Sequence, residues 1–374
     1  MNLIFNFCFS FVILVMVSCE SHESFGLKMV IPESNATRHV DTSAHDLPSD
    51  VLVIFEDSRG SYWFGSMKNG AYRYDGKSLR RYTTSDGLKS NRIRDIQEDH
   101  NGVIFIDTGE GVSRLKDDVF EPMVPRLDTS GDSWTMGAED IWFAGNWDGK
   151  GPLRYNGTDL IQLQFPRHPL EDEFFNSHPG ASYSPYQVYT THKDSKGNVW
   201  FGTATFGPGR FDGRSVRWMM ERELMEIDDG PAPGIRSIVQ DKNGDFWFSA
   251  NVNHKYQVSE DYVSAQNSIS LDYGKLQGIN TELQTGMNPY FMAMVEDHLG
   301  RFWMATHRNG VWQYDKGTLK HYPVKVGDDS VLIHRISKDN HGDLWLTTLN
   351  AGVMRLESNE FRQIRLDEIM DPRD

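Results

Sequence analysis

The chain repeats one short pattern along most of its length, and this repeat constrains the fold more than any other feature. The pattern is Asp, two residues, Gly, two residues, then an aromatic ring, and it occurs six times. Because it needs three residue types at fixed spacing, chance would give less than about one copy in a chain of this length. The copies are Asp57-Gly60-Trp63, Asp99-Gly102-Phe105, Asp194-Gly197-Trp200, Asp241-Gly244-Trp247, Asp297-Gly300-Trp303 and Asp339-Gly342-Trp345.

Each copy predicts the same unit of β-structure. A β-rich segment precedes the Asp, the Asp-x-x-Gly forms a hairpin turn, and the ring opens a second strand. Asp bonds to backbone amides in such turns, and Gly takes the positive φ that the hairpin loop requires. Two further strands follow before the next copy, so each repeat is expected to hold four short strands.

A seventh, degenerate copy lies around Trp142, where residues 139–143 keep the strand but lack the Asp and the Gly. With it, successive rings are 37 to 58 residues apart, which suits one four-stranded sheet plus insertions. The prediction is an all-β fold, a seven-bladed β-propeller of four-stranded antiparallel blades. We expect the tryptophans to form the core between blades rather than to bind ligands.

The repeat resembles the two-component regulator propeller repeat. The consensus is matched nearly throughout from Ile54 to Leu88, including Tyr82-Thr83-Thr84-Ser85-Asp86-Gly87-Leu88, and the resemblance covers residues 50–366. It implies a sensor propeller of the kind that forms the extracytoplasmic part of hybrid histidine kinases and often responds to carbohydrate. No spanning helix, kinase or DNA-binding segment follows the last repeat, so we expect a free-standing propeller.

The first residues predict an export signal. Residues 3–18 are apolar and uncharged, about as long as a signal-peptide core and shorter than a spanning helix. The run ends in Met16-Val17-Ser18-Cys19, which resembles a bacterial lipoprotein signal and implies lipidation of Cys19, although no Lys or Arg precedes the run. An ordinary cleaved signal and an uncleaved anchor are the alternatives.

These features predict four segments and a location. We expect a lipoprotein-type signal peptide at 1–18, a tether at 19–48, the propeller at 49–366 and a C-terminal tail at 367–374. No second apolar stretch follows the signal. The prediction is therefore a periplasmic or cell-surface protein that meets the membrane only through its lipid anchor.

Charge and cysteine content exclude several classes of function. The net charge of −15 argues against binding to nucleic acid. The two cysteines, Cys8 and Cys19, lie in the signal region, so the body has no disulfide, thiolate metal site or cysteine nucleophile. The acidic run Glu171-Asp172-Glu173 matches no metal motif, and no P-loop or dinucleotide fingerprint is found. We expect no metal and no cofactor.

Candidate ligand-binding residues come from counting along the predicted inner strands. By the resemblance, the first strand of each repeat is innermost, and the fifth residue before each repeat Asp lies near one end of the channel. Two arginines converging there in an acidic protein suit a carboxylate or a sulfate. The alternative is that these side chains bond to neighbouring blades. The counted positions are Leu52, Arg94, Tyr189, Arg236, Met292 and His334, of which Arg94, Tyr189, Arg236 and His334 are the candidates.

Rings and polar side chains in the longer loops are further candidates. Extra chain falls near residues 165–186 and between 250 and 291, and loops on a rigid scaffold often carry binding sites. Rings among Asn and His suit sugar binding, whereas packing of each loop on its own blade is the alternative. We select Trp147, Tyr290 and His307 from the set Asn146, Trp147, His178, Tyr183, Tyr186, Phe206, His254, Tyr290 and His307.

Three functions fit these features. The first is a non-catalytic binding or sensor propeller whose channel mouth binds an oligosaccharide or an envelope protein, and the lack of a catalytic motif favours it. The second is a polysaccharide lyase acting on a uronate-containing glycan, with His334 and Tyr189 as base and acid and Arg236 neutralising the carboxylate. The lyase hypothesis rests on analogy between propellers. The third is a propeller with a closed mouth that docks sideways onto a membrane partner.

Overall fold

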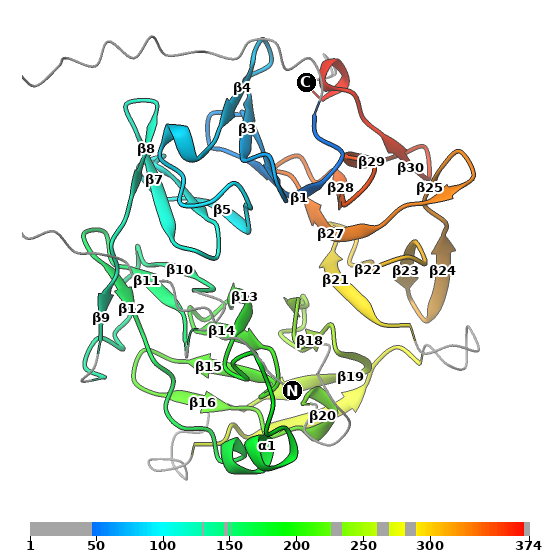
Figure 1. Cartoon of the computed structure of the whole chain (residues 1–374). Helices are drawn as coiled ribbons and strands as arrows, with labels where there is room; N and C mark the ends of the chain where they lie inside the picture. Colours follow the sequence, from blue (N-terminus) through cyan, green and yellow to red (C-terminus); the bar gives the residue numbers. More distant parts are fainter. Residues whose placement is uncertain are drawn as a thin grey trace, which may run out of the picture. The chain divides into compact units, whose positions relative to one another are not determined.

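The repeats fold into seven four-stranded sheets arranged around a common centre in the computed structural model (Figure 1). The structure describes residues 47–128, 131–145, 149, 151–225, 234–259, 269–280 and 289–369. The prediction of an all-β, seven-bladed β-propeller is confirmed. The described residues contain one α-helix, α1 (Glu171–Ser177), and none of their helices is long and apolar enough to cross a membrane.

Six blades follow one plan, in which four consecutive strands pair antiparallel in chain order and the first strand lies nearest the centre. The strands of blades 1, 2 and 4 are β1 (Val51–Glu56), β2 (Tyr62–Ser66), β3 (Ala71–Tyr74), β4 (Leu79–Tyr82), β5 (Asp95–Glu98), β6 (Ile104–Asp107), β7 (Val112–Lys116), β8 (Val119–Pro122), β13 (Val188–Lys193), β14 (Val199–Thr203), β15 (Pro208–Phe211) and β16 (Val216–Trp218).

Blades 5, 6 and 7 repeat this plan toward the C-terminus. Their strands are β17 (Ile238–Gln240), β18 (Phe246–Phe248), β19 (Asn251–Val258), β20 (Tyr273–Gln277), β21 (Phe291–Glu296), β22 (Phe302–Thr306), β23 (Val311–Asp315), β24 (Thr318–Tyr322), β27 (Ile333–Lys338), β28 (Leu344–Thr348), β29 (Val353–Glu357) and β30 (Glu360–Gln363). Short elements between blades are η1 (Thr84–Asp86), η2 (Arg222–Leu224), η3 (Leu366–Glu368) and the hairpin of β25 (Lys325–Val326) and β26 (Asp329–Ser330).

The third blade departs from this plan, because its described residues form no innermost strand. Its sheet begins with β10 (Ile141–Phe143), in which Trp142 holds the ring position that opens the second strand of other blades. Strands β11 (Leu153–Tyr155) and β12 (Leu160–Gln162) follow outward. The fourth strand is β9 (Arg126–Leu127), which precedes β10 in the chain but pairs in parallel with β12 at the outer edge. Side chains of the flanking blades therefore occupy the space that the inner strand fills in the other blades.

Side chains from the flanking blades meet the inner edge of β10. Gln97 of β5 and Thr191 of β13 both donate to the carbonyl oxygen of Trp142, at 3.0 and 3.4 Å. Arg94 crosses the same place and donates to the carbonyls of Gly145 and Val188. These bonds satisfy backbone acceptors that an inner strand would otherwise pair.

The repeated Asp caps both the turn and the ring. In blade 1, Asp57 Oδ1 accepts hydrogen bonds from the amides of Arg59 and Ser61, at 3.0 and 2.8 Å, and Oδ2 accepts one from Trp63 Nε1 at 2.8 Å. Gly60 has a φ of 76°, which suits glycine. The Asp-to-indole bond recurs at 2.7 to 3.0 Å in four further blades, and all five rings are at most 4% exposed. The predicted turn and the core role of these rings are confirmed.

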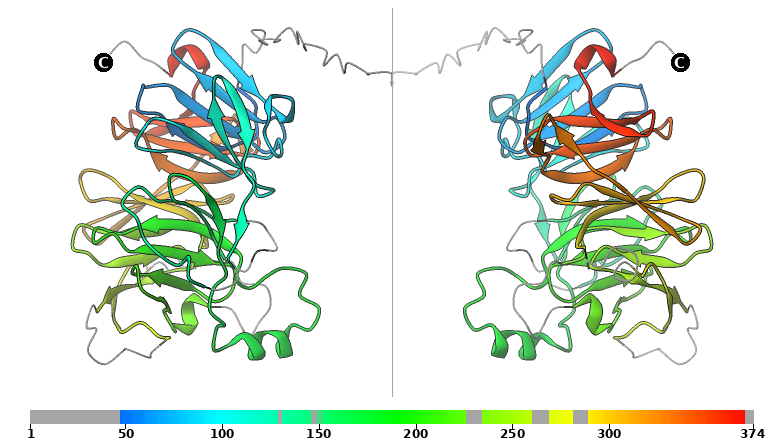
Figure 2. Two further views of the ribbon diagram at one scale, coloured as in Figure 1. Left: turned by 90° about the vertical axis from the view of Figure 1, so that its left-hand side faces the viewer. Right: turned by 90° about the vertical axis from the view of Figure 1, so that its right-hand side faces the viewer.

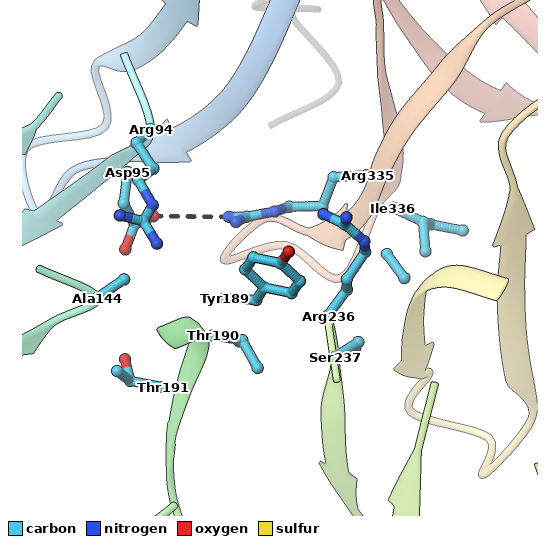
Figure 3. A pocket seen from close by; sticks show the side chains of 11 residues that line it. Arg94, Asp95, Ala144, Tyr189, Thr190, Thr191, Arg236, Ser237, Arg335 and Ile336 are labelled. Carbon is cyan, nitrogen blue, oxygen red and sulfur yellow. Dashed lines mark ion pairs between the residues drawn. The ribbon is translucent and has the colours of Figure 1, made fainter. Parts of the chain in front are cut away.

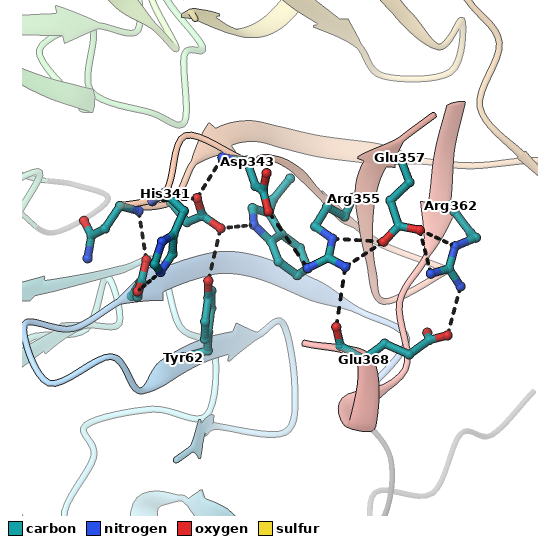
Figure 4. Close-up of polar contacts among 11 residues, drawn as sticks. Tyr62, His341, Asp343, Arg355, Glu357, Arg362 and Glu368 are labelled. Atoms are coloured by element: carbon teal, nitrogen blue, oxygen red, sulfur yellow. Dashed lines mark hydrogen bonds and ion pairs between the residues drawn. The ribbon is translucent and has the colours of Figure 1, made fainter. Parts of the chain in front are cut away.

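The ring of blades closes by contacts between blade 1 and blade 7, which share no sheet. Tyr62 of β2, labelled in Figure 4, donates to Asp339 Oδ2 at 3.1 Å, and the same oxygen accepts a hydrogen bond from Trp345 Nε1. Leu47, near the start of the described chain, and Ile369, at its end, belong to one hydrophobic cluster at this seam.

A chain of ion pairs connects the outer strands of blade 7 to η3 (Figure 4). Arg355 of β29 lies 2.6 Å from Glu357, which lies 2.7 Å from Arg362 of β30. Arg362 in turn lies 3.0 Å from Glu368 of η3. The last described turn of the chain is thus held against the outer edge of this blade.

Candidate functional site

The inner strands surround a cavity of about 210 Å³ at the centre of the propeller (Figure 3). Its walls come from residues on or beside β5, β13, β17, β21 and β27, with Ala144 next to β10. The cavity reaches Ala144 because no inner strand covers this part of blade 3. Charged and hydroxyl-bearing side chains dominate the wall, namely Arg94, Asp95, Tyr189, Thr190, Thr191, Arg236, Ser237 and Arg335.

Two tyrosines hold Arg236 at this cavity. Arg236 Nε donates to the hydroxyl of Tyr290 at 3.1 Å. The guanidinium carbon also lies 4.3 Å from the centroid of the Tyr189 ring, within the range of a cation–π interaction. A planar guanidinium fixed in this way suits two-point recognition of a carboxylate or a sulfate.

A second guanidinium reaches the cavity from β27. Arg335 lies 3.5 Å from Asp95 of β5, and both side chains are about one-third exposed. Asp95 also accepts a hydrogen bond from Gln97 at 3.0 Å. Because an ion pair this exposed holds its partners weakly, an anion in the cavity can compete for Arg335.

Arg94 is the third arginine at the cavity, and its environment is largely buried. Burial lowers its pKa, while Asp107 and Asp95 act in the opposite direction. Its bonds to the carbonyls of Gly145 and Val188 join blades 2, 3 and 4. Arg94 therefore supports the wall where the inner strand is missing and adds positive charge to the cavity.

β-Bulges interrupt the pairing of four inner strands at the counted positions. The register of β13 shifts between Val188 and Thr190, and that of β27 shifts between Ile333 and Arg335. Such bulges re-aim side chains. In blade 4 the counted residue Tyr189 lines the cavity, whereas in blade 7 the next residue, Arg335, does so. The same shift occurs in β1 and β21.

His334 lies at the seam between blades 7 and 1. Its Nδ1 is 3.1 Å from the carbonyl oxygen of Leu52 in β1. Burial, with a smaller contribution from Arg335, lowers the pKa of His334 to about 3. The imidazole is consequently neutral at physiological pH.

The remaining selected residues lie in different places. Tyr290 joins the cavity through its bond to Arg236. His307 lies beside the start of β27, with Nδ1 at 3.2 Å from the carbonyl oxygen of Ile333. Trp147 and Cys19 fall outside the described residues, as do residues 1–46.

The insertion between β12 and β13 packs against blade 4. It carries α1, which projects beyond the sheets in the side views (Figure 2). Phe174 of α1, Tyr186 and Phe206 are all buried, and the last two rings lie 4.8 Å apart. Of these loop aromatics, Tyr186 and Phe206 therefore serve packing on the blade.

The acidic residues of α1 face cationic or hydroxyl partners. Glu173 lies 2.8 Å from Arg222, Asp172 pairs with Arg167, and Glu171 accepts a hydrogen bond from Tyr186. Across the part of the chain that the structure describes, no group of three or more His, Cys, Asp or Glu side chains is arranged to hold a metal ion.

Three of the four residues counted along the sequence, Arg94, Tyr189 and Arg236, lie in the wall of one cavity, but the count passes over two charged neighbours. Arg335 and Asp95 each directly follow a counted position. Their charge and adjacency are the signals that could have marked them. His334 instead lies with its Nδ1 at the Leu52 carbonyl of blade 1 and is not part of the wall.

Neither a protein-family model nor a curated protein matches the chain. Solved structures do match. Virginiamycin B lyase from Staphylococcus aureus aligns with a TM-score of 0.58 at 13% identity, over 83% of this chain and 96% of that one. A streptogramin B lyase aligns with a TM-score of 0.55 at 13% identity, over 86% and 95%.

The extracellular domain of a putative hybrid two component system from B. thetaiotaomicron aligns with a TM-score of 0.51 at 18% identity. That match covers 84% of this chain and 39% of the other. The shared property is the propeller fold. At such identities the fold alone is common to these proteins, and function depends on the site.

Proposed function

We propose that this chain is a non-catalytic binding propeller that works outside the cytoplasm and holds an acidic group of a glycan in its central cavity. The supporting observation is Arg236, positioned by Tyr189 and Tyr290 at a cavity that also presents Arg94 and Arg335. Guanidinium groups bind carboxylate and sulfate through paired, charge-assisted hydrogen bonds.

The size of the cavity limits what enters it. At about 210 Å³ it is smaller than the roughly 300–1,000 Å³ of most small-molecule pockets. One acidic sugar residue is therefore the expected occupant, with the rest of the glycan outside. Thr190 brings a hydroxyl group to this wall, whereas the hydroxyls of Thr191 and Ser237 already donate to the carbonyls of Trp142 and Met294.

Location outside the cytoplasm and a lipid on Cys19 belong to this proposal. They rest on the apolar run at 3–18 and on the cysteine that follows it. The similarity in fold to an extracellular domain agrees with this location. Metabolic labelling with a radioactive fatty acid tests the anchor, because label in the wild type and none in Cys19→Ser is expected.

The geometry gives less support to a polysaccharide lyase. A general base works best when its pKa lies near the working pH. Burial lowers the pKa of His334 to about 3, and its Nδ1 faces the Leu52 carbonyl. His334 is also absent from the wall formed by Tyr189 and Arg236. The cavity therefore fits a protein that binds the glycan better than one that cleaves it by elimination.

The test is calorimetric titration with uronate-containing, sulfated and neutral oligosaccharides. We expect saturable binding of acidic oligosaccharides only, weakened about 10-fold or more in Arg236→Gln because a charged hydrogen-bond donor is lost. The matched control is Arg365→Gln, whose side chain is 77% exposed and pairs only at the surface with Asp367. Wild-type affinity is expected in this control.

Two outcomes would overturn the proposal. One is the absence of saturable binding by every acidic oligosaccharide. That result would favour an envelope protein as the partner. The other is the growth of ultraviolet absorbance from an unsaturated uronate during the titration, which would establish a lyase.

A further inference from the structure

Asp107 is a buried carboxylate next to the charged residues of the cavity. It ends β6 and is 1% exposed. Asp107 lies two residues after the repeat ring of its blade. The same position holds Gly65 in blade 1 and Gly202 in blade 4. A charged side chain at a position otherwise given to small residues needs a local cause.

The missing inner strand of blade 3 supplies that cause. A Cβ placed on Gly65 would lie 2.5 Å from Ile93, just before the inner strand of blade 2. A Cβ on Gly202 would lie 2.3 Å from the carbonyl oxygen of Ile235, just before the inner strand of blade 5. Where an inner strand follows in the next blade, the position holds Gly, Ala, Ser or Thr, and none of these carries a charge. No inner strand follows blade 2, so Asp107 has room there.

The carboxylate of Asp107 is only partly satisfied. Oδ1 accepts a hydrogen bond from the amide of Gly109 at 2.8 Å. Oδ2 is buried and has no hydrogen-bond partner within the described residues. A buried ionised oxygen without a partner is unfavourable, because the charge has lost its hydration.

The charged groups that act on Asp107 belong to the wall of the cavity. Arg94 attracts its negative charge and Asp95 repels it, and both come from the β5 side. Arg94 is itself influenced by Tyr189 of β13 and by Arg335 of β27. Burial outweighs the attraction of Arg94 and raises the pKa of Asp107 to about 6.

We propose that the central cavity takes up one proton on Asp107 when it binds an anion. This inference rests on the proposed function and specifies how that site is regulated. An anion in the cavity adds negative charge beside Arg94 and weakens the attraction that keeps Asp107 ionised. Protonation removes the repulsion between Asp107 and the anion. Binding therefore strengthens as the pH falls, and the coupling is reciprocal.

The size of the effect follows from linkage. Each unit by which a bound anion raises the pKa of Asp107 corresponds to a tenfold difference in affinity between the protonated and ionised protein. For a rise of about one unit, we expect affinity to be about five- to tenfold higher near pH 5 than near pH 7.5. His334, with a pKa of about 3, stays neutral across this range.

The experiment uses inorganic sulfate as the probe, since sulfate itself does not titrate between these pH values. Calorimetric titration of the wild type near pH 5 and near pH 7.5 gives the ratio of affinities. Titrations near pH 6 in buffers of different ionisation enthalpy give the number of protons taken up. For a pKa that rises by about one unit from about 6, we expect uptake of about 0.4 proton in the wild type near pH 6.

Asp107→Asn removes the titrating group at nearly constant shape. It is expected to bind sulfate with the same affinity at both pH values and without proton uptake. Asp95→Asn is the matched control, because it changes the charge of the wall but should keep the pH dependence and the proton uptake.

The outcomes separate the two proposals. Sulfate binding that is independent of pH in the wild type, or proton uptake that persists in Asp107→Asn, would overturn the role of Asp107 and leave anion binding intact. No sulfate binding at either pH would overturn anion binding and, with it, this inference. The proton count in the wild type decides the question even if the Asn variant folds poorly.

Discussion

Tyr62 of the first blade and Trp345 of the last blade donate hydrogen bonds to the same oxygen, Oδ2 of Asp339, at 3.1 and 2.7 Å. One carboxylate thus caps a turn, fixes the core ring of its own blade and joins the two ends of the ring of blades. The seam depends on such contacts because no strand of blade 1 pairs with a strand of blade 7.

Removing the Tyr62 hydroxyl should loosen the seam. We expect Tyr62→Phe to lower the free energy of unfolding by about 1 kcal/mol, the usual net value of one hydrogen bond. Tyr155→Phe is the matched control, since its hydroxyl bonds at 2.8 Å to Gly157 within blade 3. Hydrogen exchange should become faster in β1, β2 and β28 only in Tyr62→Phe. Equal exchange in both variants would contradict the role of this bond in ring closure.

Removing a repeat Asp should lower the free energy of unfolding more than removing an Asp from an exposed turn. Asp194 accepts bonds from the amides of Lys196 and Asn198 and from Trp200 Nε1, at 2.8 to 3.0 Å. Asp194→Ala leaves the buried indole N–H unpaired, so we expect a loss of about 2–4 kcal/mol in urea unfolding. Asp75→Ala, in an exposed turn that bonds Ser78 at 2.8 Å, should cost about 1 kcal/mol or less. Similar losses would contradict the special role of the indole bond.

Equivalent positions in blades 4 and 2 should respond differently to alanine. Gly202→Ala would place a Cβ 2.3 Å from the Ile235 carbonyl oxygen, and we expect a loss of about 1–3 kcal/mol or more from overpacking. Asp107→Ala introduces no such clash, because Asp107 already carries a Cβ and the substitution only removes a carboxylate whose Oδ2 has no partner within the described residues. Thermal unfolding measures both changes. A loss in Gly202→Ala that is no larger than the loss in Asp107→Ala would contradict the close contact at Gly202.

The stability of the free protein should depend on Asp107. Because its pKa is raised from 3.8 to about 6, the folded state binds this proton more tightly than the unfolded state does. The stabilising effect of the proton is complete below about pH 4 and is lost as the pH rises through about 6. Asp107→Asn should therefore gain about 2–3 kcal/mol relative to the wild type between pH 4 and pH 8 in urea unfolding. A constant difference across this range would contradict the raised pKa.

The blades could be predicted from the sequence because their signal is local. Asp57, Gly60 and Trp63 lie within seven residues, and together they fix a turn and place a core ring. The missing inner strand of blade 3 could not be predicted in this way. It follows from the parallel pairing of β9 with β12, which joins segments more than thirty residues apart where the motif has decayed.

The candidate site was predictable in part. Counting by strand places Arg94, Tyr189 and Arg236 at one cavity, since each lies near the same end of an inner strand. It does not find Arg335, which lines the wall one residue after the counted position His334. Nor does it find the environment of His334, which depends on Leu52 at the other end of the chain.

The contact between the two ends of the described chain makes circular permutation of the propeller feasible. Leu47 and Ile369 meet in one cluster, and no sheet mixes strands from the two ends. A short linker joining these ends, with new termini opened between blades 5 and 6, would leave every strand pair intact. Circular permutation at that point should therefore give the same propeller. The linear order of the blades is only one of several that this closed array permits.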